Sequence, residues 1–129
     1  MKINAICALL CLFFACPFFG SCQKTPVNYE CITPEKAKHL MDTEENLIIL
    51  DVRRQDEYDL GRIPGAILIP NEVISEQAED KLKDKNQLIL VYCRSGRRSK
   101  EAAQKLCELG YTNVKEFGGI IDWEYEIVK

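Results

Sequence analysis

One cysteine, Cys93, stands between an apolar run and three arginines in the stretch LVYCRSGRRS, residues 90–99. Guanidinium groups and the N-terminus of a following helix both stabilise negative charge, so they favour a thiolate over a thiol. The thiolate is the nucleophilic form of cysteine. We therefore expect Cys93 to be a nucleophile, and we expect Arg94, Arg97 and Arg98 to attract an anionic substrate. The alternative, a buried inert thiol, gives no reason for the adjacent cations.

The other loop residues suit an anion-binding turn. Gly96 has no Cβ, so the backbone there can curl and successive amides can point at one anion. We expect Ser95 and Gly96 to form this cradle with the neighbouring arginine amides. Asp51 and Arg53 follow another apolar run, and we predict that they orient the loop arginines by ion pairing.

Strand and helix patterns alternate along the chain. The pattern predicts strands at residues 29–32, 46–52, 66–69, 88–92 and 114–117, of which 46–52 and 88–92 are apolar runs. Helical patterns lie between them at 34–41, at a short turn at 57–60, after a cap at Asn71, and from the basic loop to Gly110, with a closing helix at 120–128. This alternation predicts an α/β fold with a mainly parallel sheet, in which sites form beyond the carboxyl ends of the strands. Asp51 and Cys93 both stand at such ends.

The N-terminal residues have a different pattern from the rest. A lysine at position 2 precedes an almost wholly apolar run at 6–19, and Gly20-Ser21 precedes Cys22. A positive start, an apolar core and small residues are the layout of an export signal. The small residues before Cys22 also resemble the lipobox of bacterial lipoproteins, in which the cysteine is lipidated.

We therefore predict a lipoprotein-type signal peptide at residues 1–22, with cleavage by ordinary signal peptidase or an uncleaved anchor as alternatives. A short polar linker at 23–28 and one domain at 29–129 would follow. The predicted location is the bacterial cell envelope, either the periplasm or, with a lipid anchor at the N-terminus, the membrane surface.

The composition narrows the possible partners. A net charge of −3 argues against nucleic acid as a partner. Outside the predicted signal the domain keeps only Cys31, Cys93 and Cys107, which is too sparse a set for a disulfide framework and lacks the Cys/His spacing of a metal site. We expect Cys31 and Cys107 to lie in the core, with a disulfide at Cys31 as the alternative in an oxidising compartment. We expect His39, the only histidine, to lie on the surface. We therefore predict no metal site.

Four segments in order resemble the rhodanese family of sulfurtransferases. They are DVRRQDEY at residues 51–58, GRIPGAILIP at 61–70, the loop CRSGRR at 93–98, and FGGIIDW at 117–123. In the second segment Arg62 replaces the histidine that is common in the family, which adds a cation near the site or a surface charge. The resemblance covers residues 29–129 and implies the three-layer rhodanese fold, a central sheet flanked by helices.

The resemblance also implies an activity. The thiolate of Cys93 would take a sulfane sulfur from a small anionic donor such as thiosulfate, forming a persulfide. A thiol or cyanide acceptor would then remove that sulfur. No cofactor is implied by this chemistry.

Two other functions remain open from the sequence. A cysteine phosphatase or arsenate reductase also holds a thiolate in an amide cradle, but a phosphatase loop places arginine after five intervening residues, where this chain has Ser99. A noncatalytic rhodanese-fold binding module is the second alternative. Such modules often lack the cysteine, and this chain keeps it.

Overall fold

The computed structural model describes residues 28–129. The predicted signal peptide, the lipidation of Cys22 and all but the last residue of the predicted linker lie outside the described residues. Between residues 28 and 129, no helix combines the length and the apolar character needed to cross a bilayer.

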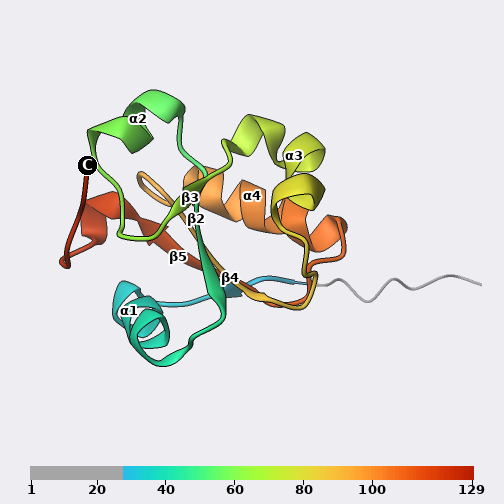
Figure 1. The fold of residues 1–129 in the computed structure, drawn as a ribbon, viewed down its shortest axis with the longest axis horizontal. Helices are drawn as coiled ribbons and strands as arrows, with labels where there is room; N and C mark the ends of the chain where they lie inside the picture. The colour runs from blue at the N-terminus through green and yellow to red at the C-terminus, as the bar shows by residue number, and fades with distance from the viewer. Residues whose placement is uncertain (1–27) are drawn as a thin grey trace, which may run out of the picture.

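A five-stranded parallel sheet forms the centre of the molecule (Figure 1). Its strands are β1 (Glu30–Cys31), β2 (Leu47–Asp51), β3 (Ile67–Leu68), β4 (Leu88–Cys93) and β5 (Val114–Gly119). Their spatial order is β1-β5-β4-β2-β3, and every adjacent pair is parallel. The carboxyl ends of the strands therefore meet at one edge, where ligand sites of open α/β sheets form.

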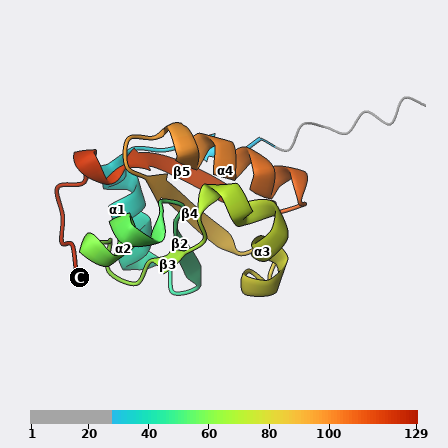
Figure 2. The same ribbon diagram turned by 90° about the horizontal axis from the view of Figure 1, so that it is seen from above.

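Helices cover both faces of this sheet, which confirms the predicted α/β three-layer fold. The helices are α1 (Pro34–Thr43), α2 (Gln55–Leu60), α3 (Ile74–Lys81) and α4 (Arg97–Glu108), and the short 3₁₀ turns are η1 (Asn71–Val73) and η2 (Ile120–Asp122). Figure 1 shows α1 on one face and α3 with α4 on the other. Seen from above in Figure 2, α2 and the C-terminal segment lie at the same end of the molecule.

The alternation of side chains along β4 explains why its sequence is apolar throughout. Ile89, Val91 and Cys93 join the core cluster beneath α3 and α4. Leu90 and Tyr92 join a second cluster on the opposite face. A strand buried on both faces needs apolar residues at every position, and each large buried aliphatic side chain stabilises the fold by roughly 1.5–3 kcal/mol.

Two of the predictions about secondary structure and burial are wrong. The closing helix at 120–128 is absent: after η2 the chain is irregular, and Val128 forms an isolated antiparallel bridge with Arg62. Trp123 ends the turn instead, because its indole Nε1 donates to the carbonyl oxygen of Glu126 and its ring packs against Phe117. Cys31 is exposed rather than in the core, because β1 is a two-residue strand at the sheet edge. Cys107 is buried, as predicted.

Candidate active site

The loop between β4 and α4 is short and tightly held. Cys93 is the last residue of β4, and α4 begins only four positions later at Arg97. Gly96 makes the turn possible because its φ of 107° lies in the left-handed region that favours glycine. Gly119 of β5 lies against the loop: a Cβ there would stand 2.0 Å from the carbonyl oxygen of Arg94. Only glycine allows this approach.

The sulfur of Cys93 faces the backbone of the loop. The Gly96 amide donates a hydrogen bond to Cys93 Sγ at 3.0 Å. The residue is 1% exposed, and apolar side chains of the α4 face pack on its other side. One amide of the predicted cradle therefore contacts the sulfur of a residue that is almost wholly buried.

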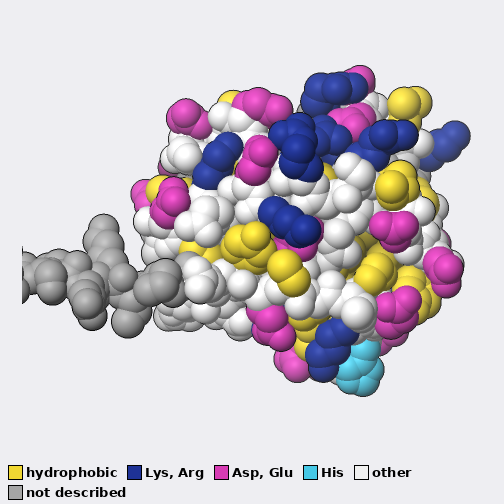
Figure 3. Space-filling model, turned by 180° about the vertical axis from the view of Figure 1, so that it is seen from behind, with side chains coloured by type: hydrophobic (Ala, Val, Ile, Leu, Met, Phe, Trp, Pro, Cys, Tyr) yellow, Lys and Arg dark blue, Asp and Glu magenta, His cyan; other side chains and the backbone are white. Residues whose placement is uncertain are grey.

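A cationic hollow of about 620 Å³ lies in front of the loop. Four arginines line it: Arg54, Arg94, Arg97 and Arg98. The rest of its lining consists of Ser95, Leu60 and the three carboxylates of Asp56, Glu57 and Glu72. On the face shown in Figure 3, Lys and Arg side chains gather over the end of the molecule that carries α2 and the start of α4. The predicted arginines and Ser95 thus come together around one recess.

The three loop arginines differ in their partners. Arg98 forms two hydrogen bonds with Glu57 of α2, from Nη1 to Oε2 at 2.7 Å and from Nη2 to Oε1 at 3.0 Å. These bonds lower the pKa of Glu57 to about 2. Arg97 pairs with Glu101 one turn along α4 and remains 75% exposed. Within residues 28–129, Arg94 forms no ion pair, so its charge is the most available to a ligand.

Asp51 and Arg53 do not orient the loop arginines, contrary to the sequence prediction. Asp51 accepts hydrogen bonds from Arg53 Nη2 at 2.8 Å and from the Tyr92 hydroxyl at 2.6 Å. Arg53 also donates to the carbonyl oxygen of Gly61 at 2.6 Å. Because these partners satisfy both buried charges, the pair braces the ends of β2 and β4 and the segment before β3. Glu57 is the carboxylate that holds a loop arginine.

The contacts of Arg62 are with residues outside the loop. Its guanidinium stacks over the ring of Tyr58 at 4.4 Å from the centroid, and its backbone pairs with Val128. It therefore acts as a packing residue that ties the C-terminal segment to α2, rather than as a further cation for the substrate.

Two buried residues behind the loop were missed by sequence analysis. Ser99 and Glu116 are 0% and 2% exposed. The Ser99 hydroxyl lies 3.4 Å from Cys93 Sγ and donates to Glu116 Oε1 at 2.6 Å. The available signal was a charged residue inside a strand of the sheet, Glu116 in β5, because charged residues are almost never buried without a partner.

Among residues 28–129, no group of three or more His, Cys, Asp or Glu side chains is placed to hold a metal ion. The chemistry available at this site is that of a thiol beside main-chain donors and guanidinium groups.

Several known proteins are similar to this chain in sequence and fold. Residues 33–126 match the Rhodanese-like domain family. The chain is 40% identical over 73 residues to thiosulfate sulfurtransferase PspE of Escherichia coli strain K12, a match that covers 57% of this chain and 70% of that protein. It is 38% identical over 88 residues to a sulfurtransferase of Allochromatium vinosum, covering 67% of this chain and 79% of that protein.

A solved structure described as rhodanese with anions from E. coli superimposes with a TM-score of 0.61 at 37% identity, covering 64% of this chain and 98% of that one. The family match includes the Cys93 loop, α2 and the end of β5. This protein therefore belongs to the Rhodanese-like domain family, together with relatives that are sulfurtransferases.

Proposed function

We propose that this protein transfers a sulfane sulfur from a small anionic donor to a thiol or cyanide through a persulfide on Cys93. The observation that carries the proposal is that Cys93 Sγ accepts a hydrogen bond from the Gly96 amide, in a loop whose Arg94, Arg97 and Arg98 line the cationic hollow. A nucleophile held beside cations suits a reaction in which anionic sulfur species both arrive and leave.

In the first half-reaction a donor such as thiosulfate enters the cationic hollow. Arg94 attracts the dianion most strongly, since its charge has no carboxylate partner among residues 28–129. The Cys93 sulfur then attacks the outer sulfur of the donor, a sulfur–sulfur bond forms, and sulfite leaves with the electron pair of the broken bond. The Gly96 N–H donates to the sulfur that carries the negative charge.

In the second half-reaction an acceptor attacks the outer sulfur of the persulfide. An apolar recess of about 330 Å³ adjoins the cationic hollow and shares Glu57, Leu60 and Arg94 with it, and we propose that the acceptor approaches beside this recess. Ile121 and Ile127, both exposed, line this recess. The acceptor leaves with the sulfur, and Cys93 is regenerated. Dividing the transfer between two displacements at one atom is nucleophilic catalysis.

Mass spectrometry of the protein treated with thiosulfate tests this proposal. We expect wild-type protein to gain the mass of one sulfur atom and to lose it on addition of cyanide with release of thiocyanate. Cys93→Ser should show neither change, whereas Cys107→Ala, which removes a buried thiol elsewhere on α4, should show both. Absence of persulfide in folded wild-type protein would favour a noncatalytic binding module. Hydrolysis of an aryl phosphate would favour a phosphatase.

The same domain is proposed to act in the bacterial cell envelope, held there by lipid on Cys22. The support is the positive start, the apolar run and the small residues before Cys22. Expression of the full chain with a labelled fatty acid tests it: label should appear in wild-type protein and be absent from Cys22→Ser. Unlabelled wild-type protein in the soluble cytoplasmic fraction would contradict this location.

A further inference from the structure

A buried chain of hydrogen bonds leads from Cys93 away from the cationic hollow. Cys93 Sγ lies 3.4 Å from Ser99 Oγ, and Ser99 Oγ lies 2.6 Å from Glu116 Oε1. The Gly118 amide donates to the same carboxylate oxygen at 2.8 Å. Residues of β4, α4 and β5 therefore converge on one hydroxyl group.

The Ser99 hydroxyl has only one proton, and its strongest acceptor is the carboxylate. The carbonyl oxygens of Gly96 and Gly118 also lie within reach of the hydroxyl, at 3.0 Å and 3.4 Å. The bond to Glu116 is shorter and is charge-assisted when the carboxyl group is ionised, so the proton lies there. The Ser99 oxygen is then left to accept the S–H of Cys93.

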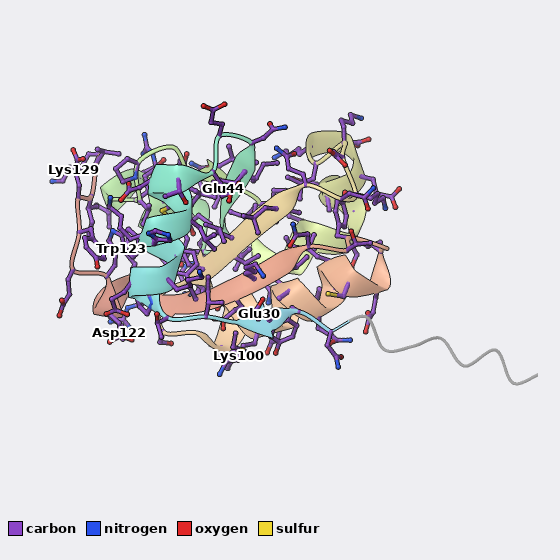
Figure 4. All side chains as sticks on the ribbon, turned by 90° about the horizontal axis from the view of Figure 1, so that it is seen from below. Glu30, Glu44, Lys100, Asp122, Trp123 and Lys129 are labelled. Atoms are coloured by element: carbon purple, nitrogen blue, oxygen red, sulfur yellow. The ribbon has the colours of Figure 1, made fainter. Side chains whose placement is uncertain are left out.

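Glu116 forms no ion pair in the described part of the chain, but Lys100 lines one hollow with it, and burial together with the nearby Glu116 raises the pKa of the Cys31 thiol. Its described hydrogen-bond donors are the Ser99 hydroxyl and the Gly118 amide. Its side chain also lines a rear hollow of about 570 Å³ on the β1 side of the loop. Lys100 and Asp122, labelled in Figure 4, line the same hollow.

These contacts limit the negative charge that the cluster can hold. A second negative charge on Cys93, close to an ionised and unpaired Glu116, would be opposed by like-charge repulsion in a poorly solvated site. Moving one proton along the chain avoids this. Such a transfer would keep one negative charge on the pair, on the carboxylate while the sulfur is a thiol and on the sulfur while the carboxyl group is neutral.

We propose that Ser99 and Glu116 carry the proton of Cys93 during sulfur transfer, with Ser99 as a catalytic residue and Glu116 as a positioning residue that acts through it. This inference rests on the proposed function. It supplies an acid–base partner to a site in which the only histidine of the chain, His39 on α1, takes no part.

The proton count balances in both half-reactions. As Cys93 attacks thiosulfate, its S–H proton passes to Ser99, the Ser99 proton passes to Glu116, and sulfite leaves with the pair from the broken S–S bond. The products are a persulfide anion and a neutral carboxyl group. As cyanide removes the outer sulfur, the pair of that S–S bond stays on Cys93. Cys93 then takes a proton from Ser99, Ser99 takes one from Glu116, and thiocyanate leaves.

The test is to measure the two half-reactions separately in Glu116→Gln. The amide oxygen of glutamine can still accept from Ser99 and Gly118, but it supplies no proton. We expect discharge of the isolated persulfide by cyanide to slow by roughly tenfold or more, because the departing Cys93 sulfur loses its proton source. Persulfide formation should change by less than about threefold, because the variant also lacks the charge that opposes a thiolate.

Two further variants separate proton transfer from structure. Ser99→Ala breaks the chain of hydrogen bonds at its middle and should reproduce the slow discharge. The double variant, with Ser99→Ala and Glu116→Gln together, should be no slower than either single variant, because the two residues act as one unit. Glu35→Gln, an exposed glutamate on the rim of the rear hollow, should leave both rates unchanged. Circular dichroism and thermal unfolding would show that each variant is folded.

A solvent deuterium isotope effect on discharge should be present in the wild type and lost in Glu116→Gln. Wild-type discharge in folded Glu116→Gln, or equally slow discharge in Glu35→Gln, would overturn the inference. Persulfide formation by the wild type would still leave the proposed function standing. If wild-type protein forms no persulfide, both are overturned.

Discussion

Arg98 and Glu57 form a two-bonded ion pair that joins the first turn of α4 to α2 at the edge of the cationic hollow. Their side chains are 17% and 15% exposed, so solvent screens the pair less than it screens surface ion pairs. The guanidinium group has a fixed position before any substrate arrives. Arg98 therefore contributes geometry to the loop, whereas the unpaired Arg94 contributes the attraction for an anion.

Replacement of Glu57 by Gln should change how stability depends on pH. Arg98 lowers the pKa of Glu57 from 4.5 to about 2, so the folded protein binds this proton less readily than the unfolded chain. The stabilisation is fully present above the unfolded value and is lost as pH falls toward 2. We expect Glu57→Gln to cost about 1–3 kcal/mol near neutral pH and progressively less on acidification.

Urea unfolding of both proteins at neutral pH and at about pH 3 measures this difference. Glu45→Gln is the matched control, because Glu45 is exposed and forms no ion pair within residues 28–129. A stability gap between wild type and Glu57→Gln that stays constant over this pH range would show that the charge of Glu57 does not stabilise the fold.

Neutralising Arg94 should weaken donor binding more than neutralising Arg97. We expect Arg94→Gln to raise the KM for thiosulfate by roughly tenfold, and Arg97→Gln to raise it by less than about threefold, because the exposed Arg97 charge is already offset by Glu101. Steady-state kinetics at two ionic strengths measures both effects. Arg94→Lys should keep most of the attraction, and equal KM values for the two Gln variants would contradict this assignment.

Asp51 should affect stability rather than the chemistry of the loop. In Asp51→Asn the buried Arg53 loses its charge partner, which typically costs about 3–5 kcal/mol. The folded fraction should form persulfide at a wild-type rate, since Asp51 contacts Arg53 and Tyr92 and not the loop arginines. Thermal unfolding together with single-turnover persulfide formation separates the two effects. A folded variant with slow persulfide formation would restore the role predicted from the sequence.

The sequence predicted the fold well because its signals are local or periodic. The central strand β4 is an uninterrupted apolar run, and Gly110 ends α4 with a positive φ of 95° as its position predicts. The closing helix failed because the residues after η2 are held by contacts distant in sequence, the bridge to Arg62 above all. No pattern within residues 120–128 records that partner.

The site was predictable to the extent that its residues adjoin Cys93 in the chain. The loop residues come together around one recess as expected. Their partners could not be predicted, because Glu57 lies 41 residues from Arg98 and Glu116 lies 17 residues from Ser99. Both pairings depend on how α2 and β5 pack beside α4, and the identity of either carboxylate alone does not indicate its partner.

Gly119 provides a direct test of the packing that holds the loop. A Cβ at this position would stand 2.0 Å from the Arg94 carbonyl oxygen and 2.6 Å from the Ser95 Cα, so Gly119→Ala must displace backbone rather than a flexible side chain. We expect it to cost about 2–3 kcal/mol and to abolish most sulfur transfer, because the loop amide that contacts Cys93 moves with the chain.

Gly110→Ala is the control for this substitution. Gly110 also has a positive φ, but no atom lies within 4 Å of its added Cβ, so the cost should be only about 1 kcal/mol from the backbone conformation. Sulfur transfer should remain close to wild type, since Gly110 lies at the far end of α4 from the loop. Thermal unfolding and thiocyanate release measure the two variants side by side. If Gly119→Ala transfers sulfur as well as Gly110→Ala does, then the approach of β5 to the loop does not position Cys93.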